Sequence, residues 1–417
     1  MNTTAQALKI TFTAYEKLVI VLLSIIQFTV ILDFMVLSPL GAFVMKDMSI
    51  VPSQFGLVVS AYAFSAGASG LLAAGFADRF DRKKILVFFY IGFIVGTSLC
   101  AVANNYQFLL FARVVTGLFG GVLGSIGFAI ITDIFRMQVR GRVMGFTQMA
   151  FAVSQVLGIP IGLLLADRYG WHSPFWMIVG LSILTFFAIL VYMKPVTEHL
   201  KLQTKQNPFL HLVKTLTKPD YIRGFLATVL LATGGFMLMP FGSAFSVFNL
   251  GIRQNQLFML YGITGIFSMI FGPLVGKYSD KIGAYRIFVF GSILSILTVA
   301  VYTRLGVTPY WIIQTINVVL FVSITCRIIS SSTLMTAVPE LSDRGAFMSI
   351  NSSFQQIAGG IASAVAGQIV VQTASGKLEN YEVLGYVVIV ATLFTIGMMY
   401  VIHKQVARKN VTANLAN

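Results

Sequence analysis

The sequence predicts an all-α membrane protein with 12 transmembrane helices in two pseudo-twofold-related six-helix bundles. Three observations support this prediction: the apolar composition, the apolar segments along the chain and an internal repeat. Hydrophobic residues make up 57% of the 417 residues, charged residues only 10%, and the mean hydropathy is +0.85. A soluble domain carries roughly 25% charged residues. This chain has too few charges to cover a water-facing surface, and we expect a lipid bilayer around it.

Each apolar segment is long enough to cross a bilayer, which takes about 20 residues. The expected spans are 17–44, 54–76, 85–103, 106–131, 142–166, 173–193, 221–249, 255–276, 285–303, 309–335, 345–372 and 383–403. One long polar and basic stretch interrupts the series. We therefore expect an N-terminal bundle over 1–193, a cytosolic linker over 194–220 and a C-terminal bundle over 221–417. A short amphipathic helix is expected near 208–217.

The basic residues are distributed unevenly among the connections. Of 29 lysines and arginines, 22 fall in the termini and in alternate loops, and five fall in the opposite set. Such a bias places the basic loops in the cytosol. It predicts both termini on the cytosolic side of a plasma membrane, or of the inner membrane if the source is a bacterium. The net charge of +15 is thus explained by topology, and no nucleic-acid partner is expected.

Two segments of the first half recur in the second. Residues 70–88 (GLLAAGFADRFDRKKILVF) align with 272–290 (GPLVGKYSDKIGAYRIFVF) at an offset of 202, and Arg140-Gly141 aligns with Arg344-Gly345 at an offset of 204. Parallel repeats of this kind place a pseudo-twofold axis along the membrane normal, with a binding site between the halves.

The repeated loop carries a resemblance to a known family. Residues 74–83 (AGFADRFDRK) are similar to the signature G-x-L-a-D-R-x-G-R-K of the major facilitator superfamily. Ala74 and Asp81 replace its two glycines, whereas the second copy keeps both, as Gly276 and Gly283. The resemblance extends over nearly the full chain and implies a transporter that works by alternating access.

The same resemblance implies a cytosolic gate, in which the carboxylate of Asp78 binds a helix N-terminus of the other half. Such a contact contributes about 0.3–1 kcal/mol when exposed and up to about 2 kcal/mol when partly buried. The alternative is a solvated basic loop. The candidate gating residues are Asp78, Arg79, Arg82, Lys83 and Asp280.

Two opposite charges lie inside spans at matching depth. Asp33 is in the first span and Arg113 in the fourth, each seven residues from the expected outer end of its helix. An acid inside a membrane costs at least about 2.5–3.5 kcal/mol and marks a functional site by default. An Asp–Arg pair that breaks and re-forms can couple a proton to conformation, whereas a static ion pair is the alternative.

The resemblance agrees with coupling. Residues 113–117 (RVVTG) are similar to the fourth-span motif R-x-x-Q-G, whose arginine the family uses in proton coupling, with Thr in place of Gln. An acid in the first span is typical of the drug:proton antiporter branch. Residues 158–162 (GIPIG) are a loose form of the antiporter motif G-P-x-x-G-G, and a plain kink at Pro160 explains them equally well.

Several further residues inside spans are candidates for solute binding, and ordinary helix packing is the alternative for each. Phe236 and Met239, just before Pro240, offer an apolar wall suited to lipophilic solutes. Arg327 either extends toward the cytosol or contacts an anion. The full candidate set is Tyr62, Gln148, Gln155, Phe236, Met239, Arg327, Asn351 and Gln355.

The sequence carries no catalytic constellation, no metal-ligand spacing and no Walker loop for ATP. Neither an enzyme nor a resident cofactor is expected, and the energy source would be the proton gradient. Cys100 and Cys326 are expected to be small buried hydrophobes. We predict a monomeric secondary active transporter that exports lipophilic or amphiphilic small molecules in exchange for protons. Transport of sugars or small organic anions, or a non-transporting receptor on the same fold, are the alternatives.

Overall fold

The protein is almost entirely helical in a computed structural model. The structure describes residues 12–76, 80–197, 200, 208–340, 343–374 and 376–415. Within these ranges it does not describe the side chains of residues 73–76, 137, 138, 141, 208–212, 280, 344, 345 and 409–415. The helices before the linker are α1 (Ala14–Val36), α2 (Gly41–Asp47), α3 (Pro52–Phe76), α4 (Arg82–Ala101), α5 (Tyr106–Ile134), α6 (Met137–Val153), the π-helix η2 (Ser154–Gly158), α7 (Ile159–Tyr169) and α8 (Ser173–Tyr192). After these come α9 (Pro208–Thr217), α10 (Pro219–Phe236), the 3-10 helix η4 (Met239–Phe241), α11 (Gly242–Phe248), the 3-10 helix η5 (Gln254–Gln256), α12 (Leu257–Ile282), α13 (Ala284–Tyr302), α14 (Tyr310–Thr336), α15 (Arg344–Ile369) and α16 (Tyr381–Leu415). A two-stranded antiparallel hairpin, β1 (Val371–Gln372) and β2 (Leu378–Glu379), precedes α16.

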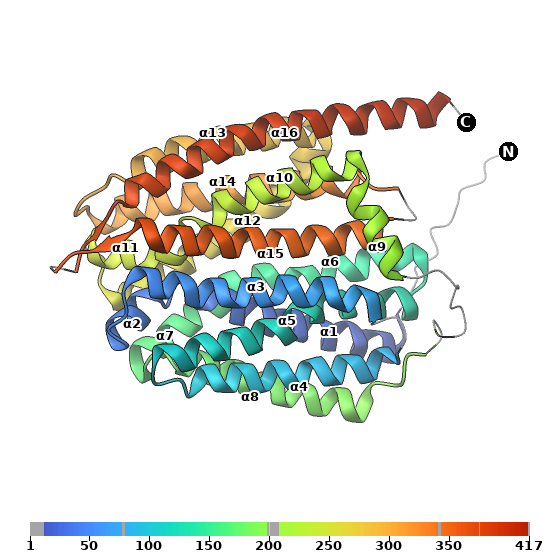
Figure 1. The fold of residues 1–417 in the computed structure, drawn as a ribbon, viewed down its shortest axis with the longest axis horizontal. Helices are drawn as coiled ribbons and strands as arrows, with labels where there is room; N and C mark the ends of the chain where they lie inside the picture. Colours follow the sequence, from blue (N-terminus) through green and yellow to red (C-terminus); the bar gives the residue numbers. More distant parts are fainter. Residues whose placement is uncertain are drawn as a thin grey trace.

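The long helices lie side by side along the long axis of the molecule (Figure 1). Within the described residues, 11 spans are long and apolar enough to cross a membrane. The remaining expected span, 345–372, forms the 26-residue helix α15. This helix carries Asn351, Gln355 and Gln356 among its serines and glycines, which lowers its apolarity. It packs between α3 and α10 (Figure 1), and Asn351 and Gln356 are half-buried there, whereas Gln355 is exposed.

Three expected spans are interrupted rather than continuous. The first breaks over residues 37–40, which include Pro39, and the seventh breaks at η4, which contains Pro240. Proline cannot donate a backbone hydrogen bond and clashes with the preceding turn, which a hydropathy reading of the sequence does not register. The fifth span contains the π-helix η2 just before Pro160, so the expected kink is present as a local change of helix type.

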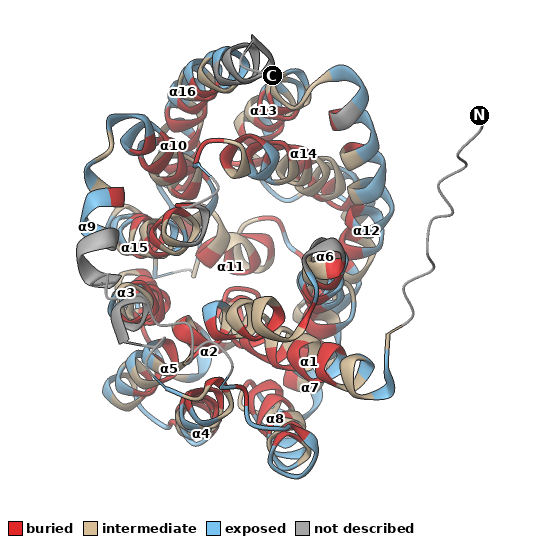
Figure 2. Cartoon of the chain, turned by 90° about the vertical axis from the view of Figure 1, so that its right-hand side faces the viewer, coloured by how far each residue is buried: buried red, intermediate tan, exposed pale blue. Residues whose placement is uncertain are grey.

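Viewed along the helices, α1–α5, α7 and α8 group together and α10 with α13–α16 group opposite them (Figure 2). The two groups meet most extensively where α3 packs against α15. A Cβ atom at Gly56 would lie 2.7 Å from the carbonyl oxygen of Ser363, so only glycine allows this approach. The hydroxyl of Ser60 donates to the carbonyl of Gly360 at 2.8 Å across the same interface.

The two groups are also joined at the end of the molecule opposite the linker. There Ser243 Oγ of α11 donates to the carbonyl of Ser38 at 3.0 Å, and the rings of Phe55 and Phe241 lie 6.1 Å apart. All four residues are buried. The broken ends of the first and seventh spans therefore close this end of the molecule.

The expected helix near 208–217 is confirmed as α9, next to α3, α15 and α10 at the linker end (Figure 1). Cys100 and Cys326 are free and buried, as expected.

Candidate functional site

The two mid-membrane charges form a buried ion pair. Arg113 Nη1 on α5 donates to Asp33 Oδ2 on α1 at 2.8 Å, with side-chain exposures of 1% and 0%. A second, longer hydrogen bond of 3.4 Å runs from Nη1 to the main-chain carbonyl of Asp33. A charge at this depth is tolerated only when an opposite charge and hydrogen bonds compensate its lost hydration. The matching depths read from the sequence thus correspond to direct contact.

Residues of two further helices complete the surroundings of the pair. Thr97 of α4 donates to Asp33 Oδ1 at 3.3 Å, and the ring of Tyr62 on α3 lies 4.5 Å from the guanidinium carbon of Arg113. Such a cation–π contact stabilises a desolvated cation by about 2 kcal/mol. Close approach of α3 and α5 makes it possible, because a Cβ atom at Gly117 would lie 2.4 Å from the carbonyl oxygen of Tyr62.

An aromatic chain connects the ion pair to the second half of the molecule. Phe34, the residue after Asp33, has its ring 5.2 Å from that of Tyr62 and 5.7 Å from that of Phe236 on α10. Phe236 packs on α15, where a Cβ atom at Gly359 would lie 2.9 Å from its ring. Any movement of α10 relative to α1 must therefore disturb the residues that surround Arg113.

The other candidate solute-binding residues are spread over several helices. Gln155 of η2 lines a small cavity between the halves with Ile159, Tyr261, Thr264, Gly265 and Phe321. Asn351 of α15 accepts a hydrogen bond from Thr228 Oγ1 at 2.6 Å. Met239 is half-buried at the break of the seventh span, whereas Gln148 on α6 and Gln355 on α15 are exposed. Tyr62 and Phe236 are the two candidates that the Phe34 ring connects.

Arg327 is buried, at 4% exposure, inside the second half of the molecule. Its Nη1 atom donates to Ser295 Oγ of α13 at 3.4 Å. The side chain thus does not reach the solvent at the linker end, which removes the interpretation that it extends to the cytosol.

The described gating candidates are held within the first half. Arg82 forms an ion pair with Asp133 of α5 at 3.1 Å. Lys83 Nζ donates to the carbonyls of Leu190 and Met193 at 3.0 and 2.6 Å, which satisfies free acceptors at the end of α8. Asp78 and Arg79 lie outside the described residues, as does the side chain of Asp280, and a contact between the halves here stays a prediction.

Sequence reasoning did not identify a polar cluster at the linker end of the second half. Asp343 accepts hydrogen bonds from Lys218 Nζ and from the hydroxyl of Tyr221, the latter at 2.9 Å. The Asp343 hydrogen bond raises the pKa of Lys218 above its usual range. The only sequence signal was the position of Asp343 next to the repeated Arg344-Gly345 dipeptide.

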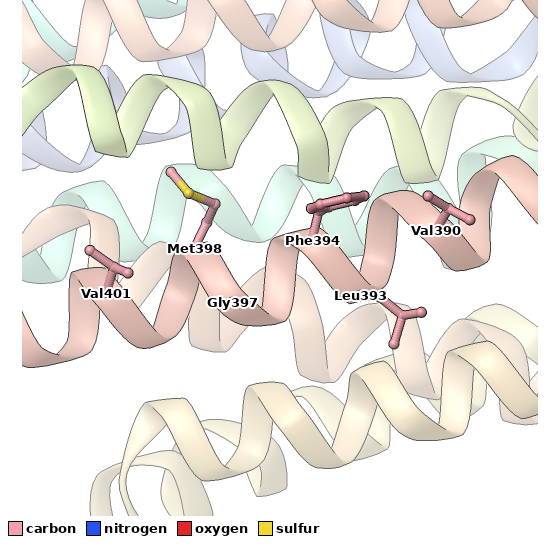
Figure 3. A pocket seen from close by; sticks show the side chains of 6 residues that line it. All are labelled: Val390, Leu393, Phe394, Gly397, Met398 and Val401. Atoms are coloured by element: carbon pink, nitrogen blue, oxygen red, sulfur yellow. The ribbon is translucent and has the colours of Figure 1, made fainter.

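A separate shallow groove runs along α16 and is lined by Val390, Leu393, Phe394, Gly397, Met398 and Val401 (Figure 3). All six are apolar, and α16 meets the length and composition of a membrane span. This groove has the character of a lipid-facing surface and contributes no polar group to the candidate site.

Comparison with known proteins identifies relatives over most of the chain. The family model of the Major Facilitator Superfamily matches residues 23–363. The chain is 27% identical over 272 residues to the uncharacterized MFS-type transporter YceJ of Bacillus subtilis, an alignment that covers 64% of this chain and 68% of that protein.

Two further relatives have more informative names. Multidrug resistance protein 3 of Bacillus subtilis is 30% identical over 202 residues, covering 48% of this chain and 38% of that protein. A probable sugar efflux transporter of Helicobacter pylori is 25% identical over 246 residues, covering 58% of this chain and 61% of that protein. Both alignments span less than two thirds of the relative.

Solved structures share the fold at low sequence identity. A bacterial homolog of the human lysosomal transporter Spinster, in an inward-facing and unoccupied conformation, matches with a TM-score of 0.69 at 16% identity, over 94% of this chain and 96% of that one. The nucleoside transporter NupG matches with a TM-score of 0.66 at 14% identity, over 93% and 99% of the two chains.

Proposed function

Because the chain belongs to the Major Facilitator Superfamily, we propose that it is a secondary transporter that exports lipophilic or amphiphilic small molecules in exchange for protons. Its relatives are transporters and its helices are those of a membrane protein. The single observation that carries the proton-coupled part of the proposal is the buried Asp33–Arg113 ion pair. The twelve-crossing, two-bundle organisation and the cytosolic termini belong to the same proposal.

The ion pair supports proton coupling because Asp33 is charged when it pairs with Arg113 and neutral when it is protonated. A carboxylate that pairs with a guanidinium carries no proton, and protonation of Asp33 removes the attraction that holds Arg113 at 2.8 Å. Since an unpaired buried arginine is costly, protonation must be followed by a rearrangement around Arg113. Tyr62 is placed to hold the guanidinium during that step.

The aromatic chain supports a link between the proton and the solute. Phe34 joins Tyr62 to Phe236, so a change at Asp33 reaches the surface between the halves through direct ring contacts. A solute that packs against Phe236 and Met239 would contact the same series of aromatic rings at its Phe236 end, opposite the end at Asp33. Apolar and aromatic walls favour lipophilic solutes over sugars, which need many hydrogen bonds.

The packing at the end opposite the linker supports alternating access. Ser38, Phe55, Ser243 and Phe241 close the end opposite the linker. If the linker is cytosolic, as the distribution of basic residues predicts, the molecule is closed on the outer side. The change to the outward-facing state would have to break these contacts and form contacts between the halves at residues 75–84.

Export of sugars is the second candidate function. The similarity to a sugar efflux transporter of Helicobacter pylori favours it. Gln155 and Asn351, with their amide side chains, would then supply hydrogen bonds to the solute. Organic anion transport has less support, because Arg113 is already paired with Asp33 and Arg327 lies inside the second half.

Flux measurements in proteoliposomes test the proposal. A panel of lipophilic cations, neutral amphiphiles, sugars and organic anions is assayed with and without an imposed proton gradient. The proposal predicts gradient-driven uptake of an amphiphile by the protein molecules whose cytosolic side faces the outside of the proteoliposome, and an accompanying rise in internal pH. Flux of sugars alone would support the second candidate, and binding without flux of any solute would indicate a receptor.

A further inference from the structure

A second buried cation, Arg327, lies in the membrane region, and the described part of the chain places no counter-charge beside it. Among the described residues no carboxylate pairs with Arg327, and its Nε and Nη2 atoms have no hydrogen-bond partner. Its one hydrogen bond goes to Ser295 Oγ. Buried polar groups in native proteins are nearly always satisfied, and a buried charge without a partner costs several kcal/mol. Arg327 therefore requires a partner that the side chains around it do not supply.

Three hydroxyl groups on the helices around Arg327 share this property. The Oγ atoms of Ser292 and Ser330 and the Oγ1 atom of Thr392 are buried and have no partner within the described part of the chain. Ser330 is one helical turn from Arg327 on α14, and Ser292 is one turn from Ser295 on α13. Residues three apart share a helix face. Ser292 and Ser330 therefore lie on the helix faces that carry Ser295 and Arg327.

Close helix packing brings these groups together. A Cβ atom at Gly291 of α13 would lie 2.5 Å from Cys326 Cβ and 3.4 Å from the backbone nitrogen of Arg327, so α13 and α14 are in contact at this level. A Cβ atom at Gly234 of α10 would lie 3.4 Å from Arg327 Nη2 and 3.8 Å from Thr392 Oγ1. The guanidinium and the threonine hydroxyl therefore both approach the same point on α10.

The first half of the molecule shows how the charge of a buried arginine is compensated, although Nε of Arg113 also has no hydrogen-bond partner among the described residues. There, α1 presents Asp33 to Arg113 of α5, and Thr97 of α4 donates to the same carboxylate. In the second half, α10 approaches Arg327 at Gly234, a residue without a side chain. Both arginines have a hydroxyl-bearing residue from a neighbouring helix nearby, Thr97 of α4 near Arg113 and Ser295 of α13 near Arg327. Among the described residues, only Arg113 also has a carboxylate, that of Asp33.

We propose that the Arg327 cluster, comprising Ser292, Ser295, Arg327, Ser330 and Thr392, binds a small monovalent inorganic anion such as chloride. A guanidinium with several hydroxyl donors and no carboxylate is a set of ligands for an anion. The tight approach of Gly234 favours a small ion over phosphate or sulfate. The three helices that contribute the cluster, α13, α14 and α16, and the helix α10 that packs on it all belong to the second half, so this ion is a resident of the bundle and not the transported solute.

Chloride titration of the purified protein tests the site. The full-length protein is placed in chloride-free gluconate buffer, and thermal unfolding is followed as chloride replaces gluconate at constant ionic strength. A ligand that binds only the folded protein raises its stability with concentration. We expect a saturable rise in Tm with chloride and bromide, and none with sulfate.

Two variants identify the cluster as the origin of that response. Arg327→Gln removes the charge and is expected to abolish the chloride-dependent rise in Tm. Gly234→Asp supplies an internal carboxylate that pairs with Arg327, and it is also expected to abolish the chloride-dependent rise in Tm. This second variant tests the site if Arg327→Gln does not fold. Gly235→Asp is the matched control: Gly235 is exposed with nothing within 4 Å of its Cβ position, and the variant should keep the response.

The proposal is overturned if chloride does not stabilise the wild-type protein, or if the response survives in Gly234→Asp. Because the readout is stability, it is independent of any transport activity.

Discussion

The Asp33–Arg113 pair allows a quantitative test of how strongly the two charges depend on each other. Asp33→Asn removes the negative charge while keeping the shape of the side chain, and leaves the guanidinium of Arg113 buried at 1% exposure with no opposite charge. Arg113→Gln leaves the carboxylate in the reverse situation. The double variant Asp33→Asn/Arg113→Gln removes both charges at once.

Breaking a buried pair by removing one partner typically costs about 3–5 kcal/mol, because the remaining charge stays without compensation. We expect each single variant to lose a free energy of unfolding in this range. The double variant leaves no stranded charge, so its loss should be smaller than the sum of the two by about 2 kcal/mol or more. Thr97→Val, which removes only the 3.3 Å hydrogen bond to Asp33, should cost about 1 kcal/mol.

Equilibrium unfolding in mixed micelles with a denaturing detergent measures these differences. Fully additive losses for the two single variants would refute the reasoning, since they would mean that neither charge compensates the other. Single variants as stable as the wild type would also refute it, because a buried charge without a partner would then carry no cost.

Three further outcomes follow from other contacts. Ser243→Ala removes one hydrogen bond between the halves at the end opposite the linker, so thiol labelling of a cysteine placed there should increase several-fold. Gly56→Val places side-chain atoms where a Cβ already lies 2.7 Å from Ser363 O, and should abolish transport and lower Tm, whereas substitution of the open position Gly145 should not. Because Asp343 raises the pKa of Lys218, that contact stabilises the folded protein at pH values below about 10.4 and is lost as the pH rises through the raised pKa. Unfolding measured from pH 8 to 11 should show this loss in the wild type and not in Asp343→Asn.

Hydropathy and loop charge predicted most helices of the fold, because membrane helices satisfy their own backbone hydrogen bonds and need only apolar length. The breaks near Pro39 and Pro240 were not predicted, although proline is a known helix breaker. The apolar character of a segment indicates that it can enter lipid but does not specify its backbone geometry, and at both breaks a proline lies inside an otherwise apolar segment.

The candidate site was predictable only in part. Equal depth along two helices was enough to suggest that Asp33 and Arg113 meet. The ring of Tyr62 over Arg113 depends on the close approach of α3 and α5 at Gly117, which sequence spacing does not specify. For Arg327 the sequence showed a position inside a span without showing whether the side chain is buried or which helices face it, and so it left open whether the charge had a partner.

Proton release on solute binding tests the central claim most directly. The purified protein, in unbuffered detergent solution near neutral pH, is mixed with a transported amphiphile while the bulk pH is recorded. If the solute and the proton compete through Asp33, solute binding should shift the protein from the form with a protonated Asp33 to the form with the intact Asp33–Arg113 pair. The wild type should then release protons from its protonated fraction, and Asp33→Asn should bind the solute and release none. Equal release from both proteins would contradict the account, because the exchanged proton would then reside elsewhere.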